Sequence, residues 1–183
     1  LMATAKEKPR TVRWATSGPA SLGPLMLEQL LDQAKVEMVH VPYKGGGQQM
    51  NDALSGQFEV LSTNAGPAVG AHIKAGKLRP LAVGAPKRLE SLPQVPTLAE
   101  LGYARANLSS QFGIIAPART PKGVIDKHNA QVNAALQLPD LRSRLLATDN
   151  VPTGGSAEAF RAGIGAESDA NLRIIRAVGI KAD

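Results

Sequence analysis

The stretch VHVPYKGGGQQMNDALSG, residues 39–56, decides the fold because it holds a strand, a glycine turn and a helix in close succession. The β-branched Val39 and Val41 predict a buried strand. The glycines at 45–47 leave the backbone bare where the chain turns into a helix predicted over Gln48–Leu54. A strand that passes through glycines into a helix indicates an α/β protein.

A glycine turn that leads into a helix is suited to binding anions. The first N–H groups of a helix have no partner within it, and they carry the positive end of the helix dipole. A plain tight turn explains the same glycines, and the phosphate-binding patterns G-x-x-x-x-G-K-S/T and G-x-G-x-x-G are absent. The local sequence therefore leaves both interpretations open.

Two other segments repeat the strand-to-helix arrangement. Thr11–Thr16 predicts a strand that leads through a loop at 17–21 into a helix over Leu22–Ala34. Phe58–Ser62 predicts another strand, followed by a loop at 63–66 and a helix that stops at Gly76. Strand–helix units in series imply parallel strands with right-handed crossovers. In such sheets, ligands gather where the carboxyl ends of the strands meet the helix starts.

The first of these helices has a clear start signal and a clear apolar face. Ser21 is the expected N-cap, and Pro24 suits the first turn, where its missing N–H costs nothing. The apolar positions recur with helical spacing and predict one buried stripe, made of Leu27, Leu30, Leu31 and Ala34.

The second half of the chain is richer in helices than in strands. We expect strands over Leu81–Ala85 and Leu108–Ala116. Three helices are then predicted, with Ser156 as the cap of the last and Gly179 as its stop. They cover Pro121–Leu136, Asp140–Ala147 and Ala157–Val178.

Composition bounds the class of protein. With 183 residues, 43% hydrophobic and 20% charged, the chain is of globular type. No segment approaches the roughly 18 consecutive apolar residues of a membrane span, and the first residues lack the apolar centre of a signal peptide. The absence of cysteine excludes disulfides and thiolate chemistry.

The net charge of +6 raises the hypothesis of a nucleic-acid binder. Half of that excess falls within residues 1–13, outside any predicted groove. The chain has one Trp, two Tyr and three Phe, too few for the stacking platforms of single-strand binders. A small anionic ligand fits the charge as well, and no nucleic-acid partner is expected.

The residues offer little support for an enzyme. Gly18, Ser21 and Gly23 approximate the nucleophile elbow G-x-S-x-G, but with one residue too many. The histidines show no metal-binding spacing; they are His40, His72 and His128. No catalytic residue, metal or cofactor is therefore predicted. An α/β enzyme acting on a small anionic substrate at the same strand-end loops stays the alternative.

Four motifs point to a family. They are HVPYKGGG at 40–47, HIKAGKLRPLAV at 72–83, KRLESLPQVPTLAELG at 87–102 and FGIIAPARTPKGVIDKHNAQVNAAL at 112–136. In this order and spacing they resemble the Bug-type substrate-binding receptors of the tripartite tricarboxylate transporter family. The resemblance implies an α/β fold of the periplasmic binding protein type, a type II-like clamshell. It also implies a periplasmic location and a role in passing a small carboxylate to membrane transporter subunits.

The resemblance also implies a division of the chain. Family members begin with a further region that carries a P-F/Y-x-x-G-G-x-x-D motif, and this sequence has no counterpart. We therefore expect an end segment at 1–10, a nearly complete α/β ligand-binding lobe at 11–106, and a returning segment of the other lobe at 107–183. The signal peptide would belong to the missing part.

The first candidate binding loop follows the first strand. The family loop of type S-x-G-S-x-x-H matches the segment from Ser17, and it implies that Ser17, Gly18 and Ser21 offer hydroxyl and N–H donors. Two departures affect this loop: Ala20 stands where glycine is usual, and Pro24 where histidine is usual. They indicate a ligand that differs from the commonest ones.

The other two candidate loops follow the next two strands. The P-Y-K-G motif is intact and implies ligand contacts from Tyr43, Gly45 and Gly46, although a packed ring explains Tyr43 equally well. Thr63 and Asn64 are the candidates in the third loop. Main-chain N–H groups, hydroxyls and bound waters can hold a carboxylate without a buried arginine.

The ligand class is a small carboxylate: a di- or tricarboxylate, an amino acid or an aromatic acid. One helix start contributes about 0.3 to 2 kcal/mol, whereas micromolar affinity requires about 8 kcal/mol. Two lobes are therefore expected to share the binding, with hinges at 80–85 and 107–110. The 183-residue chain alone is expected to bind weakly or not at all.

Overall fold

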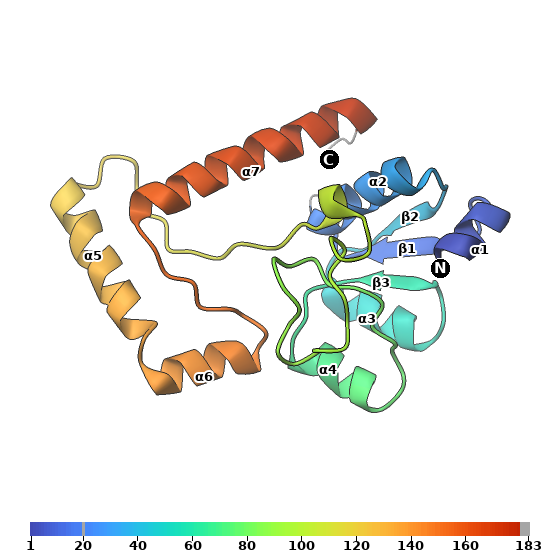
Figure 1. Ribbon diagram of the computed structural model, residues 1–183, viewed down its shortest axis with the longest axis horizontal. Coiled ribbons are helices and arrows are strands. Elements are labelled where there is room, and N and C mark those ends of the chain that lie inside the picture. Colours follow the sequence, from blue (N-terminus) through green and yellow to red (C-terminus); the bar gives the residue numbers. More distant parts are fainter. Residues whose placement is uncertain (20, 180–183) are drawn as a thin grey trace. The chain divides into compact units, whose positions relative to one another are not determined.

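The computed structural model describes residues 1–19 and 21–179 (Figure 1). The chain divides into two compact units, which are described separately. The first holds Leu1–Ser110 together with the residues from Leu172 onward, and the second holds Gln111–Asn171.

The first unit is built on a parallel sheet of three strands in the order β2-β1-β3 (Figure 1). At the carboxyl end of the central strand, Thr16 pairs with Pro42 on one side and with Ser62 on the other. The three strands therefore end level with one another, and the predicted parallel sheet is confirmed. The strands are β1 (Arg13–Thr16), β2 (Val39–Pro42) and β3 (Val60–Ser62).

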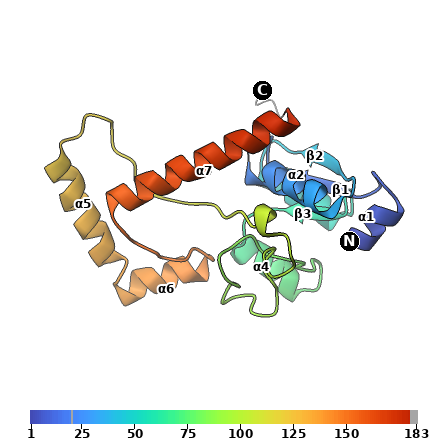
Figure 2. The same ribbon diagram turned by 45° about the horizontal axis from the view of Figure 1, so that its top comes forward.

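Helices cover both faces of this sheet. The connections from β1 to β2 and from β2 back across to β3 run in opposite directions, so right-handed crossovers place α2 and α3 on opposite faces (Figures 1 and 2). The helical elements are α1 (Met2–Glu7), α2 (Leu22–Ala34), α3 (Gly46–Leu54), α4 (Pro67–Lys74) and the 3₁₀ turn η1 (Ala104–Ala106).

The helix predictions hold closely, with one shift. Helix α2 has the predicted bounds, whereas α3 begins two residues before Gln48. The break falls at Gly45, whose φ of 122° lies in the region that favours glycine. Gly46 and Gly47 therefore already belong to the helix, and their N–H groups lie in its first turn.

The hydrophobic core lies between the sheet, α1, α2 and residues of the segment 98–106. Leu27 and Leu30 of α2 are each 1% exposed, and Leu31 and Ala34 pack against the same cluster. Ala5 of α1 is fully buried in it, so residues expected to form an end segment contribute to the core. The buried cluster also includes Val12, Trp14, Val36, Met38, Val60, Leu98 and Ala106.

Gly23 allows α2 to start directly against the carboxyl ends of two strands. A Cβ at this position would lie 2.7 Å from Thr16 Cγ2 and 3.0 Å from Ser62 Oγ. A larger residue would push the helix start away from the strand ends. Pro24 is buried beside it, in the first turn as predicted.

Two predicted strands are wrong. Leu81–Ala85 forms only an isolated parallel bridge, between Val83 and Thr97, and Leu108–Ala116 has no regular structure. The Asn107 side chain takes the place of a neighbouring strand for Ala85. Its Nδ2 donates to the Ala85 carbonyl at 2.8 Å, and its Oδ1 accepts from the Ala85 N–H at 3.3 Å.

The second unit is helical and lacks a buried core. None of the residues in 111–171 is buried, and Phe112, Ile114 and Ile115 are 73%, 79% and 81% exposed. The predicted cap of the last helix is confirmed, because Ser156 Oγ accepts from the Ala159 N–H at 3.0 Å. The helices are α5 (Lys122–Ala135), α6 (Pro139–Ala147) and α7 (Ala157–Val178), the last of which continues into the first unit. Among the described residues, no helix combines the length and the apolar character needed to cross a membrane.

Candidate ligand-binding site

The loops after β1 and β2 are joined by backbone hydrogen bonds. The Tyr43 N–H donates to the Thr16 carbonyl at 2.9 Å, and the Gly45 N–H donates to the Ser17 carbonyl at 3.1 Å. A Cβ on Gly18 would lie 3.7 Å from the Tyr43 carbonyl oxygen. Four of the predicted site residues therefore lie side by side, because the parallel strands end level.

Ser21 uses its hydroxyl within the first loop. Its Oγ donates to the Gly18 carbonyl at 2.8 Å, and it makes no hydrogen bond to the N–H groups of α2. Ser21 thus occupies the predicted N-cap position, but the predicted capping hydrogen bond is wrong. Ala20, where the family pattern has glycine, lies outside the described residues.

A buried pair supports the start of this loop. The Thr16 side chain is fully buried, and its Oγ1 lies 3.2 Å from the Gly18 carbonyl oxygen and 2.8 Å from His40 Nε2. Burial lowers the pKa of His40, so its ring is neutral at pH 7. The Thr16 hydroxyl and His40 Nε2 share the hydrogen bond of 2.8 Å. His40 therefore supports the start of this loop.

Tyr43 is engaged by its own unit. Its hydroxyl donates to Asp52 Oδ2 at 2.9 Å, and its ring meets that of Phe58 edge-on at a centroid distance of 5.7 Å. Burial is the main cause that raises the pKa of the Tyr43 phenol, and the hydrogen bond to Asp52 raises it further. The geometry favours the packed-ring interpretation, and a ligand contact from Tyr43 stays a prediction.

Gln49 fixes the start of α3 over the strand ends. Its side chain is fully buried, and its Nε2 donates to the Ala15 carbonyl at 2.9 Å and to the Ser62 carbonyl at 3.0 Å. These two oxygens belong to β1 and β3, so one amide ties the helix to both strands. We did not predict this role. The feature of the sequence that could have indicated it is a glutamine in the first turn of a helix that follows three glycines.

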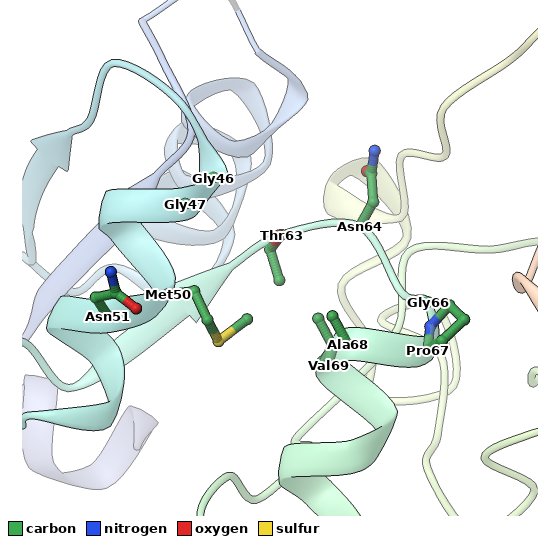
Figure 3. A pocket seen from close by; sticks show the side chains of 10 residues that line it. All are labelled: Gly46, Gly47, Met50, Asn51, Thr63, Asn64, Gly66, Pro67, Ala68 and Val69. Atoms are coloured by element: carbon green, nitrogen blue, oxygen red, sulfur yellow. The ribbon is translucent and has the colours of Figure 1, made fainter.

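A cavity of about 550 Å³ lies between the starts of α3 and α4, beside the end of β3 (Figure 3). Three predicted site residues line it, namely Gly46, Thr63 and Asn64. The other predicted site residues do not line it: Ser17, Gly18, Ser21, Tyr43 and Gly45. The remaining lining residues are Gly47, Met50, Asn51, Gly66, Pro67, Ala68 and Val69.

Four backbone N–H groups at this cavity have no hydrogen-bond partner among the residues that the structure describes. Gly46 and Gly47 begin α3, and Ala68 and Val69 follow Pro67 at the start of α4. The hydrogen bonds found among the described residues include none from these four N–H groups. Two helix starts, each with N–H groups that lack a partner within the helix, therefore line one cavity.

The side chains around the cavity are neutral. Asn51, Thr63 and Asn64 supply amide and hydroxyl groups, and none of the ten lining residues is charged. Asn64 Oδ1 accepts a long hydrogen bond of 3.4 Å from Ser110 Oγ. No group of residues suited to hold a metal ion is found in the described part of the chain. The arrangement is chemically suited to an anion bound by backbone amides.

A parallel sheet whose strand-end loops and helix starts surround a cavity is an α/β arrangement of the periplasmic binding protein type. The comparisons with known proteins agree with this class. Residues 1–180 match the model of the tripartite tricarboxylate transporter family receptor. The chain belongs to this family.

Individual relatives support the same assignment. Protein BugT of Bordetella pertussis is 33% identical over 183 residues, which are 99% of this chain and 55% of BugT. A solved periplasmic transporter superposes with a TM-score of 0.85 at 31% identity, over 100% of this chain and 60% of its own. An R. palustris protein solved with adipate gives a TM-score of 0.84 at 30% identity, over 98% of this chain and 60% of its own. The chain thus spans a little over half the length of these relatives.

Proposed function

We propose that this chain is the carboxylate-binding part of a periplasmic solute receptor, and that it holds one carboxylate group at the cavity between α3 and α4. The observation that carries the proposal is the set of four unpartnered N–H groups, from Gly46, Gly47, Ala68 and Val69, around one cavity. A carboxylate has two oxygens, each of which accepts two hydrogen bonds, so four donors match one carboxylate.

The predicted site residues take different roles in this proposal. Gly46, Thr63 and Asn64 line the cavity and contact the ligand. The first loop, from Ser17 to Ser21, holds the second loop in place through the hydrogen bond from Gly45 to Ser17. The relative solved with adipate supports a small organic acid as the ligand.

The receptor would act in the periplasm and pass its ligand to membrane subunits of a tripartite transporter. The family match supports this role, since family members are solute-binding receptors. The alternative, an α/β enzyme at the same strand ends, has little support in the geometry. The cavity is lined by neutral side chains, and the one histidine near the strand ends is bonded to Thr16.

Binding by the described cavity alone is weak on energetic grounds. A helix start contributes at most about 2 kcal/mol to an anion. Two starts together give at most about 4 kcal/mol, so a dissociation constant of about 1 mM is the tightest that they alone can support. The test must therefore detect millimolar binding.

The proposal is tested by titrating the ¹⁵N-labelled chain with adipate and following its amide signals by NMR. We expect the N–H signals of Gly46, Gly47, Ala68 and Val69 to shift together, with a dissociation constant on the order of 1 mM. If no amide signal shifts at adipate concentrations of about 50 mM, far above that value, the proposed function is wrong.

A pair of variants isolates the contribution of one N–H group. Gly46→Pro removes an N–H at the first helical position, where proline is well tolerated. Gly46→Ala keeps the N–H, and its Cβ meets nothing within 4 Å. We expect the alanine variant to bind adipate like the wild type and the proline variant to bind several-fold more weakly. Equal binding by both variants would remove this amide from the site.

A further inference from the structure

We propose that the cavity between α3 and α4 selects carboxylic acids with an apolar chain, and that Met50 and Val69 determine this selectivity. The inference rests on the proposed function, because it assumes that the free amides hold the carboxylate group. It goes further because it assigns the chemistry of the rest of the ligand and names the residues that contact that part of the ligand.

The two residues form opposite walls of the cavity. Met50 lies on α3 one turn beyond Gly46 and Gly47, and Val69 lies in the first turn of α4. Figure 3 shows the Met50 side chain reaching from α3 toward Ala68 and Val69 across the cavity. Both side chains are only partly buried, so a ligand can cover the apolar surface that they still expose.

A carboxylate at the helix starts directs the rest of the ligand between these walls. The free N–H groups and the apolar side chains belong to the same two helices, and they line the same cavity. An unbranched hydrocarbon chain attached to the bound carboxylate would therefore contact Met50 and Val69. The flexible thioether of Met50 can adapt to chains of different shape.

The neutral lining argues against heavily charged ligands. None of the ten lining residues carries a charge, so a second or third carboxylate near Met50 or Val69 would lose hydration without gaining a cation. Hexanoate places its single carboxylate at the amides and its apolar chain against Met50 and Val69. Citrate must place two further carboxylates and a hydroxyl in the rest of the cavity. Hexanoate is therefore expected to bind more tightly than citrate.

Chain length gives the quantitative test. Each buried methylene increases affinity about fourfold. Hexanoate has two methylenes more than butanoate, so the wild-type chain should bind hexanoate about fifteenfold more tightly. The ¹³C signal of the Met50 ε-methyl should shift on titration with hexanoate, as should the methyl signals of Val69.

Two isosteric variants test the assigned residues. Met50→Gln and Val69→Thr exchange an apolar group for a polar one of similar size on partly exposed positions. Each should lower the preference for hexanoate over butanoate at least threefold. Val124→Thr, at a 44% exposed position of α5, is the control and should preserve the preference.

The outcomes separate this inference from the proposed function. If carboxylates shift the cavity amides but hexanoate leaves the Met50 methyl signal unmoved, or binds no better than butanoate or citrate, the inference is wrong and the proposed function stands. If no carboxylate shifts any amide signal, both are wrong. The methyl signals are read in the wild-type chain, so the test does not depend on a variant that folds.

Discussion

Single residues determine which backbone amides stay free for a ligand. The N–H of Gly45 is used to hold the first loop, through the Ser17 carbonyl, while the N–H of the next residue, Gly46, is left free at the cavity. Gly45 can do this because its φ of 122° suits glycine. The turn therefore places an amide that is used within the fold next to one that is free for the proposed ligand.

Residue chemistry explains what the sequence could and could not predict at the site. The position of three candidate residues near the strand ends was predictable, because Thr63 and Asn64 directly follow β3 and Gly46 begins the helix after β2, and parallel strands end at the same side of a sheet. Met50 and Val69 lie within helices, and the faces that they present depend on how α3 and α4 pack. That packing is a tertiary property, so no local motif indicates it.

The ion pair between Arg13 and Glu59, at the amino ends of β1 and β3, should make the stability of the protein depend on pH in the acidic range. Glu59 accepts hydrogen bonds from the Arg13 side chain and from the Arg13 N–H, which lowers the pKa of Glu59 to about 2. Because the pKa is lowered in the folded state, the stabilisation is complete above about pH 4.5 and is lost as the pH falls toward 2. Both side chains are over 40% exposed, so we expect a contribution of only about 1 kcal/mol.

The measurement compares the wild type with Glu59→Gln in urea unfolding at several pH values. The variant keeps the shape of the side chain and one acceptor for the Arg13 N–H. We expect the wild type to be more stable by about 1 kcal/mol at pH 7 and by progressively less below pH 4.5. A difference that stays constant from pH 7 to pH 2.5 would show that the carboxylate charge does not contribute.

Among the elements, those with local signals were predicted and those that depend on distant partners were not. Helix α2 was predicted to the residue because its apolar stripe and its start signal lie within the helix. Leu81–Ala85 has the composition of a strand, but it finds a single bridge to Thr97 instead of a neighbouring strand. Strand formation requires a hydrogen-bonded partner, and the pattern of one segment does not contain it.

The two segments predicted as hinges are held together by one side chain. Asn107 satisfies both the N–H and the carbonyl of Ala85, and the Leu108 carbonyl packs so closely on Gly84 that a Cβ would not fit. Asn107→Ala would leave both backbone groups of Ala85 without these partners. We expect a loss of about 1 to 3 kcal/mol in the free energy of unfolding.

Urea unfolding of Asn107→Ala and Asn107→Asp checks this arrangement. Aspartate keeps an acceptor for the Ala85 N–H but loses the donor to the Ala85 carbonyl. The free energy of unfolding of Asn107→Asp should therefore lie between those of the wild type and Asn107→Ala, or close to that of Asn107→Ala. If Asn107→Ala were as stable as the wild type, the two hydrogen bonds between Asn107 and Ala85 would not stabilise the unit.

At the scale of the whole molecule, the two compact units differ in how much apolar surface they bury. The first unit has a continuous core around Trp14, Leu27 and Leu30. In the second unit, residues 111–171 contain no buried residue, and the segment from Phe112 to Ile115 is largely exposed. Hydrophobic burial is the main source of folding stability, so the units should not be equally stable.

Hydrogen exchange of two helices of nearly equal length tests this difference. Helix α2 has 13 residues and buries Leu27 and Leu30, whereas α5 has 14 residues and buries none. Helices owe most of their stability to the packing of an apolar face, so α5 should open far more readily. We expect its amide protons to exchange at least about tenfold faster than those of α2, as measured by NMR or mass spectrometry. Equal protection of the two helices would contradict the expectation and would mean that the chain unfolds as one cooperative unit.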